Sequence, residues 1–224
     1  MGKVKMNESK KRAILIGAGE LESSMAELIK KGMSESDSVI ALDGGLAFCA
    51  EHGIEPDRIV GDFDSLPAEK KELLEKYPQQ IIFRLPCEKD DTDTLAAIRM
   101  AVELGYENFC IYGGLGGRLS HTMANIQGLM YLKERGLYGV LLGDNRRIFL
   151  VKDEGVTLDA QENGYVSVFA YSERTEGVTI RNLKYEVADA ELTNVFPIGV
   201  SNEFIGKEAE IFVKKGTLLV VIEE

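Results

Sequence analysis

The sequence has no tryptophan, two histidines and three cysteines among its 224 residues. The cysteines, Cys49, Cys87 and Cys110, are far apart and form no CxxC pair. This spacing argues against a disulfide framework and against a structural zinc site. We therefore expect buried free thiols and a reducing, cytoplasmic compartment.

Long apolar segments and an excess of basic residues are also absent. The apolar run at residues 13–18 is far below the ~18 residues that a membrane span needs, and no signal-peptide pattern is visible. The 26 Lys and Arg residues face 37 Asp and Glu residues, which gives a net charge of −11. This balance argues against a broad basic surface for nucleic acid, and we expect neither a nucleic-acid nor a membrane partner. Phosphate binding through a divalent metal stays compatible with it.

The first two thirds of the chain contain short, continuous apolar runs separated by helical segments. The runs are residues 13–17, 38–42, 58–60, 80–83, 108–112 and 139–142. Continuous rather than alternating apolar strands are typical of a parallel sheet covered on both faces. Leu95, Ile98 and Val102 have helical spacing. The pattern predicts an α/β, Rossmann-like parallel-sheet domain over residues 13–148, preceded by a flexible basic tail over residues 1–12.

Near residue 150 the pattern changes, because no later segment has sustained helical spacing. Strand-like runs at residues 165–169, 177–180, 209–213 and 217–222 alternate with Gly, Asn and Ser turns. Short strands at such spacing are typical of a small β-sandwich or barrel. The sequence therefore predicts a second domain, a small all-β sandwich, over residues 149–224.

Carboxylates follow three of the predicted parallel strands. Asp43 comes after the run 38–42, Asp62 and Asp64 come after 58–60, and Asp90, Asp91 and Asp93 come after 80–83. Ligands of open parallel sheets bind outside the carboxyl ends of the strands, so these side chains would converge. Clustered carboxylates repel one another, and a hard divalent cation, most simply Mg²⁺, relieves the repulsion. The alternative is that they are ordinary turn and cap residues.

A glycine-rich loop follows the run 108–112. Gly113 to Gly117 can bring backbone N–H groups close to phosphate oxygens, and Arg118 can bind a phosphate through two parallel hydrogen bonds. A simple tight turn is the alternative for the loop, and capping or packing is the alternative for His121. Gly17-Ala18-Gly19 lacks the third glycine of a dinucleotide-binding fingerprint, and neither a P-loop nor the protein-kinase motifs occur.

Four motifs, taken in order, resemble the thiamine pyrophosphokinase (thiamine diphosphokinase) family. They are Asp43-Gly44-Gly45, Pro56-Asp57-x-x-x-Gly61-Asp62-Phe63-Asp64-Ser65, Lys89-Asp90-x-Thr92-Asp93 and Gly116-Gly117-Arg118-x-x-His121. Gly177-Val-Thr-Ile180, Leu183-Lys-Tyr185 and Ser201-Asn-Glu203 extend the resemblance over most of the chain. The resemblance implies a homodimeric, Mg²⁺-dependent enzyme that transfers the β,γ-diphosphate of ATP to the hydroxyl of thiamine and releases AMP. It also implies an α/β catalytic domain followed by a β-sandwich.

The resemblance assigns a role to each matching residue. Asp62, Asp64, Asp90 and Asp93 would form the catalytic set, and the first three would hold Mg²⁺. ATP and its phosphates would be bound by Asp43, Ser65, Lys89, Thr92, Gly116, Gly117, Arg118 and His121. Thiamine would be contacted by Tyr185, Ser201 and Asn202, with the last two donated across the dimer. One aspartate would orient or deprotonate the thiamine hydroxyl. A strong base is not required, because diphosphoryl transfer depends mainly on positioning and charge neutralisation.

Two features depart from the family pattern and leave alternatives open. Ser120 stands where the family usually has Asp before the histidine, and the chain has no Trp for stacking on the substrate. Tyr185 is a possible substitute for that Trp, and strand packing is its alternative role. A second function is diphosphoryl transfer to another hydroxymethyl acceptor such as a pterin. A third is a non-catalytic thiamine- or nucleotide-binding regulator, against which the complete set of aspartates argues.

Overall fold

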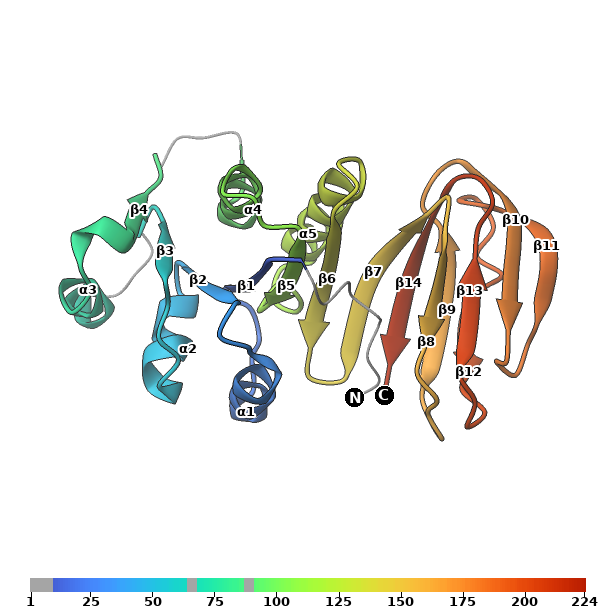
Figure 1. The fold of residues 1–224 in the computed structure, drawn as a ribbon, viewed down its shortest axis with the longest axis horizontal. Coiled ribbons are helices and arrows are strands. Elements are labelled where there is room, and N and C mark those ends of the chain that lie inside the picture. Colours follow the sequence, from blue (N-terminus) through green and yellow to red (C-terminus); the bar gives the residue numbers. More distant parts are fainter. Residues whose placement is uncertain (1–9, 64–67, 87–90) are drawn as a thin grey trace. The chain divides into compact units, whose positions relative to one another are not determined.

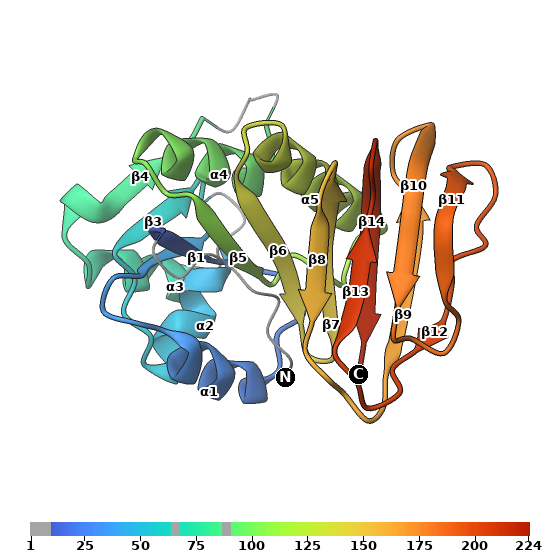
Figure 2. The same ribbon diagram turned by 45° about the vertical axis from the view of Figure 1, so that its right-hand side comes forward.

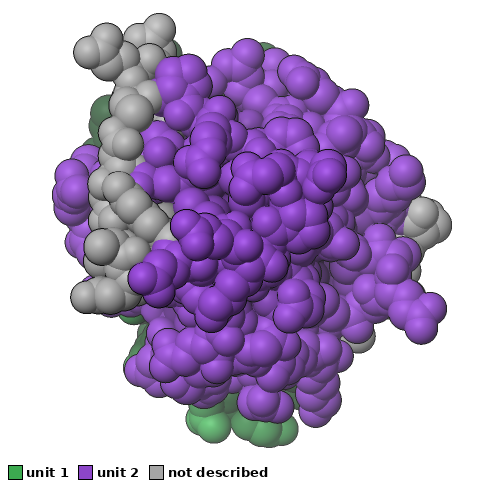
Figure 3. All heavy atoms as spheres, turned by 90° about the vertical axis from the view of Figure 1, so that its left-hand side faces the viewer, with its two compact units in different colours: residues 1–8, 145–224 green, residues 9–144 purple. Residues whose placement is uncertain are grey.

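The computed structural model describes residues 10–63, 68–86 and 91–224. Its contacts divide the chain into two compact units, of which one ends at Asp144 and the other begins at Asn145. Figure 3 shows the two units in different colours. Within the described ranges, no helix is both long and apolar enough to cross a membrane.

Parallel strands form the centre of the N-terminal unit (Figure 1). They are β1 (Arg12–Ile16), β2 (Ser38–Leu42), β3 (Arg58–Gly61), β4 (Ile82–Arg84), β5 (Asn108–Tyr112) and β6 (Tyr138–Gly143). Their order across the sheet is β6-β5-β1-β2-β3-β4. Every residue of β2 is buried, whereas β4, at the edge, has no buried residue. The continuous apolar runs therefore correspond to strands covered on both faces, as the sequence predicted.

Helices cover both faces of this parallel sheet. They are α1 (Ser23–Gly32), α2 (Gly45–His52), α3 (Ala68–Glu75), α4 (Asp93–Glu103) and α5 (Leu119–Lys133), with a short 3₁₀ turn at Gln79–Ile81. Figure 1 shows α1, α2 and α3 on one side of the sheet and α4 and α5 on the other. The helix predicted from Leu95, Ile98 and Val102 is α4. It is followed by Gly105, which has a φ of 82° and ends the helix.

The C-terminal unit consists of antiparallel strands (Figure 2). They are β7 (Arg146–Lys152), β8 (Gly155–Leu158), β9 (Tyr165–Ala170), β10 (Arg174–Arg181), β11 (Val187–Thr193), β12 (Asn202–Glu203), β13 (Ala209–Phe212) and β14 (Thr217–Glu223). One group has the order β12-β9-β14-β7 and the other the order β11-β10-β13-β8. Both groups contribute buried apolar side chains, such as Val168 and Val220 from the first and Ile211 from the second.

Two of the predicted free thiols are buried in the N-terminal unit. Cys49 lies on α2 and Cys110 on β5, and both are free. Burial raises the pKa of Cys49 to about 12 and the pKa of Cys110 to about 11. Cys87 lies outside the described residues.

We expect the thiols of Cys49 and Cys110 to resist iodoacetamide near pH 8 in the folded protein, because the thiolate is the reactive form. Peptide mass spectrometry should find both residues unmodified under native conditions and modified in denaturant. Rapid native labelling of either peptide would contradict their burial.

The same burial predicts that the free energy of unfolding depends on pH. Unfolded thiols ionise near pH ~8.5, so the contribution of the two thiols is complete below that pH. It is lost progressively as the pH rises towards the folded values of about 11 and 12.

Candidate active site

The loops that carry most of the predicted catalytic and phosphate-binding residues leave one edge of the parallel sheet. Asp43 follows β2, Asp62 follows β3, and the glycine-rich loop follows β5. The chain extends the sheet from β1 to β4 in one direction and then returns to place β5 on the other side of β1. The carboxyl ends of β1 and β5 therefore form the topological switch point, where ligands of open α/β sheets bind.

Asp43 is fixed over the end of the neighbouring strand β3. Its N–H donates to the carbonyl of Val60 at 3.0 Å, and its Oδ1 accepts from the N–H of Phe63 at 3.2 Å. Asp43 and Phe63 have φ values of 45° and 60°, in the left-handed region. Such strain costs ~1–3 kcal/mol per residue and is common at functional sites. The carboxylate of Asp43 consequently lies beside the β3 loop that carries the partly buried Asp62.

Thr92 and Asp93 lie at the start of α4. The Thr92 hydroxyl accepts a hydrogen bond from the N–H of Leu95 at 3.2 Å, which caps the helix. Asp93 is in the first turn, where the helix dipole favours a negative charge. Asp91, the residue before Thr92, forms an ion pair of 2.5 Å with Arg99. Helix capping thus accounts for one interaction of Thr92, at a helix that begins on the edge carrying Asp43 and Asp62.

Four predicted site residues, Asp64, Ser65, Lys89 and Asp90, lie outside the described residues. Two of them, Asp64 and Asp90, belong to the predicted Mg²⁺ ligand set. Across residues 10–63, 68–86 and 91–224, no group of three or more His, Cys, Asp or Glu side chains is arranged to hold a metal ion. The metal site therefore stays a prediction from sequence.

Two glycine-rich loops lie against each other at the switch point. The N–H of Gly17 donates to the carbonyl of Tyr112 at 2.8 Å, and the N–H of Gly19 donates to the carbonyl of Gly113 at 2.9 Å. A Cβ added to Gly19 would lie 2.8 Å from the carbonyl carbon of Gly113, so only glycine allows this approach. The carboxylate of Glu20 then accepts from the N–H of Gly117 at 3.2 Å. The glycines of residues 17–19 therefore form part of the framework of the site.

The first turn of α5 follows the glycine-rich loop directly. Arg118 precedes the helix, and Arg118, Ser120 and His121 are all exposed. The amide of Asn125, one turn further along α5, donates to the carbonyl of Gly114 at 2.8 Å and ties the loop to the helix. The first N–H groups of a helix lack intrahelical partners and carry partial positive charge. The exposed Arg118 and the start of α5 therefore offer donors to an anion.

The three predicted thiamine-contacting residues come together in the C-terminal unit. The buried Asn202 accepts at Oδ1 from the N–H of Tyr185 and from that of Glu203, both at 2.9 Å, and donates from Nδ2 to the carbonyl of Tyr185 at 2.6 Å. The N–H of Ser201 donates to the hydroxyl of Ser167 at 3.0 Å. The Tyr185 side chain is 62% exposed, so strand packing does not account for it. Asn202 fixes the backbone that presents this ring.

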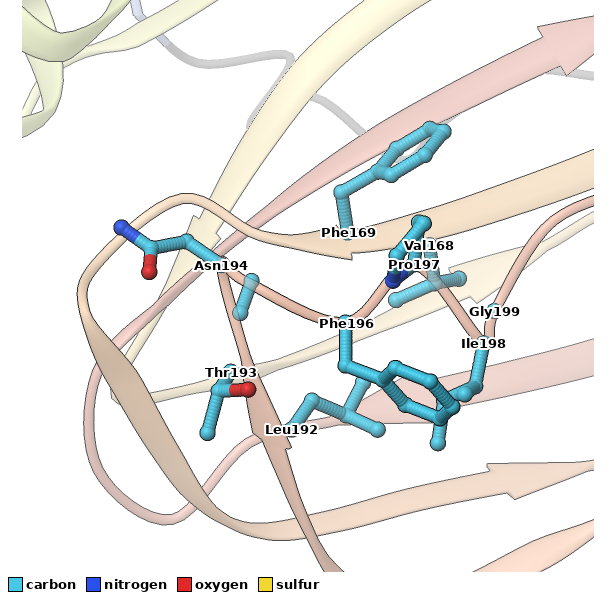
Figure 4. A pocket seen from close by; sticks show the side chains of 10 residues that line it. Val168, Phe169, Leu192, Thr193, Asn194, Phe196, Pro197, Ile198 and Gly199 are labelled. Atoms are coloured by element: carbon cyan, nitrogen blue, oxygen red, sulfur yellow. The ribbon is translucent and has the colours of Figure 1, made fainter.

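An apolar segment leads into Ser201. Val195 and Phe196 are 84% and 66% exposed, and Ile198 is 57% exposed. Figure 4 shows Phe196 beside Ile198 and Leu192 at a small pocket, with Phe169 on its other side. The chain thus exposes several apolar side chains directly before Ser201.

The sequence of the chain matches models of two protein domains. The model of the thiamin pyrophosphokinase catalytic domain matches residues 29–140, and the model of the thiamin pyrophosphokinase vitamin B1 binding domain matches residues 153–218. The chain belongs to the thiamin pyrophosphokinase family. The resemblance inferred from the four sequence motifs is thereby confirmed.

Members of the thiamin pyrophosphokinase family resemble the chain over most of its length. Thiamine pyrophosphokinase of Bacillus subtilis (strain 168) is 28% identical over 184 residues, which cover 81% of this chain and 85% of that protein. The crystal structure of thiamine pyrophosphokinase from Bacillus subtilis matches with a TM-score of 0.86 and 25% identity, over 95% of this chain and 99% of that one. The structure from Geobacillus thermodenitrificans has a TM-score of 0.83 and 25% identity, with coverages of 95% and 97%. The predicted fold class, a Rossmann-like α/β domain followed by a β-sandwich, is confirmed.

The predicted residue set of this thiamin pyrophosphokinase family member omits Glu20. Its bond to Gly117 joins residues 97 positions apart, which no local pattern reveals. The available signal was Gly17-Ala18-Gly19, a pair of glycines directly after the first strand. Its proximity to Gly113 depends on the strand order, which places β1 beside β5.

Proposed function

We propose that the chain is a thiamine diphosphokinase, which transfers the β,γ-diphosphate of ATP to the hydroxyl of thiamine and releases AMP. The observation that carries this proposal is the match to both the catalytic and the vitamin B1 binding domain models in one chain. Asp43 and Asp62 lie at the carboxyl ends of the parallel strands, the edge at which open α/β sheets bind nucleotides, and this position supports the proposal.

The metal-dependent part of the reaction is assigned to the aspartates. Carboxylate oxygens are the ligands that Mg²⁺ prefers, so Asp62, together with Asp64 and Asp90, fits this ion. When bound, Mg²⁺ supplies neutralisation of the triphosphate charge. Asp43 keeps the β3 loop in place through its bond from the Phe63 N–H. Asp93 lies at the start of α4, where it can orient or accept the proton of the thiamine hydroxyl.

The remaining contacts orient the two substrates. Arg118 binds phosphate oxygens beside the first turn of α5, which favours anions. The exposed ring of Tyr185 offers a face for stacking on the thiamine pyrimidine. Ser201 directly precedes Asn202, whose side chain is bonded to the backbone of Tyr185. Catalysis then comes from positioning and charge neutralisation, without a strong base.

One assay tests the proposed function against its alternatives. The protein is incubated with ATP, Mg²⁺ and thiamine, and chromatography follows AMP and thiamine diphosphate. We expect both products to appear in equal amounts and to depend on thiamine. AMP formation with a hydroxymethylpterin but not with thiamine would favour the second acceptor. Binding of thiamine or ATP without turnover would favour a regulator.

We also propose a homodimer in the cytoplasm. The exposed apolar side chains of Val195, Phe196 and Ile198 support a second copy as partner, because they directly precede the proposed thiamine contact Ser201. A dimer that covers this segment brings Ser201 to a subunit interface. The free, buried thiols of Cys49 and Cys110 support a reducing compartment.

Phe196→Lys should convert the dimer into a monomer and remove most of the activity, because a charge would be buried in an apolar interface. Light scattering coupled to gel filtration measures the mass, and the AMP assay measures the activity. Leu104→Lys is the matched control: Leu104 is a 42% exposed apolar residue at the end of α4, where a positive charge is favoured. It should remain dimeric and active. A fully active monomeric wild type would contradict the proposal.

A further inference from the structure

The side chain of Glu20 lies against the glycine-rich loop. Its Oε1 accepts from the N–H of Gly117 at 3.2 Å. A Cβ added to Gly116 would lie 2.6 Å from Oε2 and 3.0 Å from the Cβ of Glu20, so the whole side chain packs on this glycine. Residues 113–121 contain no Asp or Glu. The carboxylate at this loop is therefore supplied by the loop after β1.

The loop that Glu20 contacts consists mostly of glycine, which makes its backbone flexible. Gly113, Gly114, Gly116 and Gly117 leave Leu115 as the one residue of the loop with a side chain. Gly116 and Gly117 have φ values of 82° and 61°. Glycine loses more conformational freedom on ordering than any other residue, so a ligand that had to order this loop would bind more weakly. A bond that orders the loop beforehand removes this cost from the binding step.

The bond from Gly117 acts next to the groups that face an anion. Arg118 follows Gly117 directly, and α5 begins at the next residue. At the other end of the loop, the N–H of Gly19 is bonded to Gly113 and the amide of Asn125 to Gly114. Glu20 supplies the corresponding anchor at Gly117, one residue before Arg118. Glu20 therefore anchors the backbone directly before Arg118.

We propose that Glu20 is a positioning residue for the nucleotide. By accepting the Gly117 N–H, it presets the glycine-rich loop and aims Arg118 and the start of α5 at the phosphates. This inference rests on the proposed function. The role requires an acceptor oxygen on a side chain of this length and does not require its charge, so glutamine can replace glutamate.

Kinetics with ATP separate this role from a general structural one. We expect Glu20→Ala to raise the KM for ATP about tenfold, equivalent to 1.4 kcal/mol, with kcat within about twofold. Glu20→Gln should restore a KM close to that of the wild type. Glu22→Ala removes the same charge from a residue that makes no capping hydrogen bond with α1, and its kinetics should not change. Calorimetric titration with Mg²⁺-ATP should show the same order of affinities.

Amide exchange provides a readout that does not depend on activity. In ¹⁵N NMR spectra, the Gly117 amide should be protected in the wild type and in Glu20→Gln and should exchange faster in Glu20→Ala. An unchanged ATP affinity in Glu20→Ala would overturn the inference, as would a Glu20→Gln variant as weak as Glu20→Ala. Tighter ATP binding by either variant would mean that the carboxylate competes with phosphate, and would also overturn it. Absence of thiamine diphosphate formation by the wild type would reject the proposed function alone, because ATP affinity and amide exchange still decide the role of Glu20.

Discussion

Asp62→Asn should lower kcat about a thousandfold while leaving the thermal unfolding midpoint nearly unchanged. The substitution keeps the size of the side chain at the end of β3 and removes the charge that would hold Mg²⁺. Raising the Mg²⁺ concentration should recover part of the activity, because a weakened metal site fills at higher concentration. Rates of AMP formation as a function of Mg²⁺ measure both effects.

Glu35→Gln is the control for the loss of one negative charge. Glu35 is exposed in the connection between α1 and β2, and its amide variant should have wild-type kinetics. An Asp62→Asn variant within threefold of wild-type activity would remove Asp62 from the catalytic set. The family resemblance predicts the same large loss for Asp64→Asn, whose position lies outside the described residues.

Gly45→Ala should destabilise the N-terminal unit by about 3 kcal/mol, because overpacking forces the backbone to shift. A Cβ at Gly45 would overlap the carbonyl oxygen of Ile16 and lie 2.7 Å from its carbon, and neither atom belongs to a movable side chain. Asp43 lies two residues before Gly45, so the same shift should also lower activity. The unfolding midpoint should fall by roughly 6–12 °C for a chain of this size.

Gly32→Ala is the matched control for this substitution. A Cβ at Gly32, the last residue of α1, would meet no atom within 4 Å. Replacing such a glycine restricts the unfolded chain and should be neutral or slightly stabilising. Calorimetry of the two variants compares the same chemical change at a crowded and at an open position. Equal midpoints would show that α2 can move away from β1 at little cost.

The central strands could be predicted because their environment leaves a simple trace in the sequence. The continuous apolar runs at 38–42 and 108–112 coincide with β2 and β5, which have helices on both faces. The edge strand β11 was not predicted, because Val187–Thr193 contains one buried residue and two of its apolar positions are Ala, which give a weak signal. β12 was also missed because it has two residues. β12 pairs with β9, which is distant in sequence, so no local pattern announces it. β11 pairs with the preceding strand β10 but buries one residue, so its environment leaves little trace in the sequence.

The candidate site could be proposed from the sequence where residue order carried the information. Asp43 and Asp62 follow successive strands, and their motifs identified the family. The contacts of Glu20 and Asn202 could not be predicted, because they are hydrogen bonds across loops: Glu20 accepts from the N–H of Gly117, and Asn202 bonds to the backbone of Tyr185. Asn202 was predicted as a thiamine contact. Its amide is engaged with backbone groups in the structure, a distinction that residue type alone does not make.

The arrangement around Asn202 has a consequence for redesign of the substrate preference. Its amide holds the N–H and the carbonyl of Tyr185 at 2.9 and 2.6 Å, whereas the Tyr185 ring is 62% exposed. The local fold at this position therefore depends on the N–H and the carbonyl of residue 185, which every residue type except proline possesses. A library of all side chains except proline at position 185 should yield folded proteins, so selection among the variants would report their preference for the acceptor molecule alone.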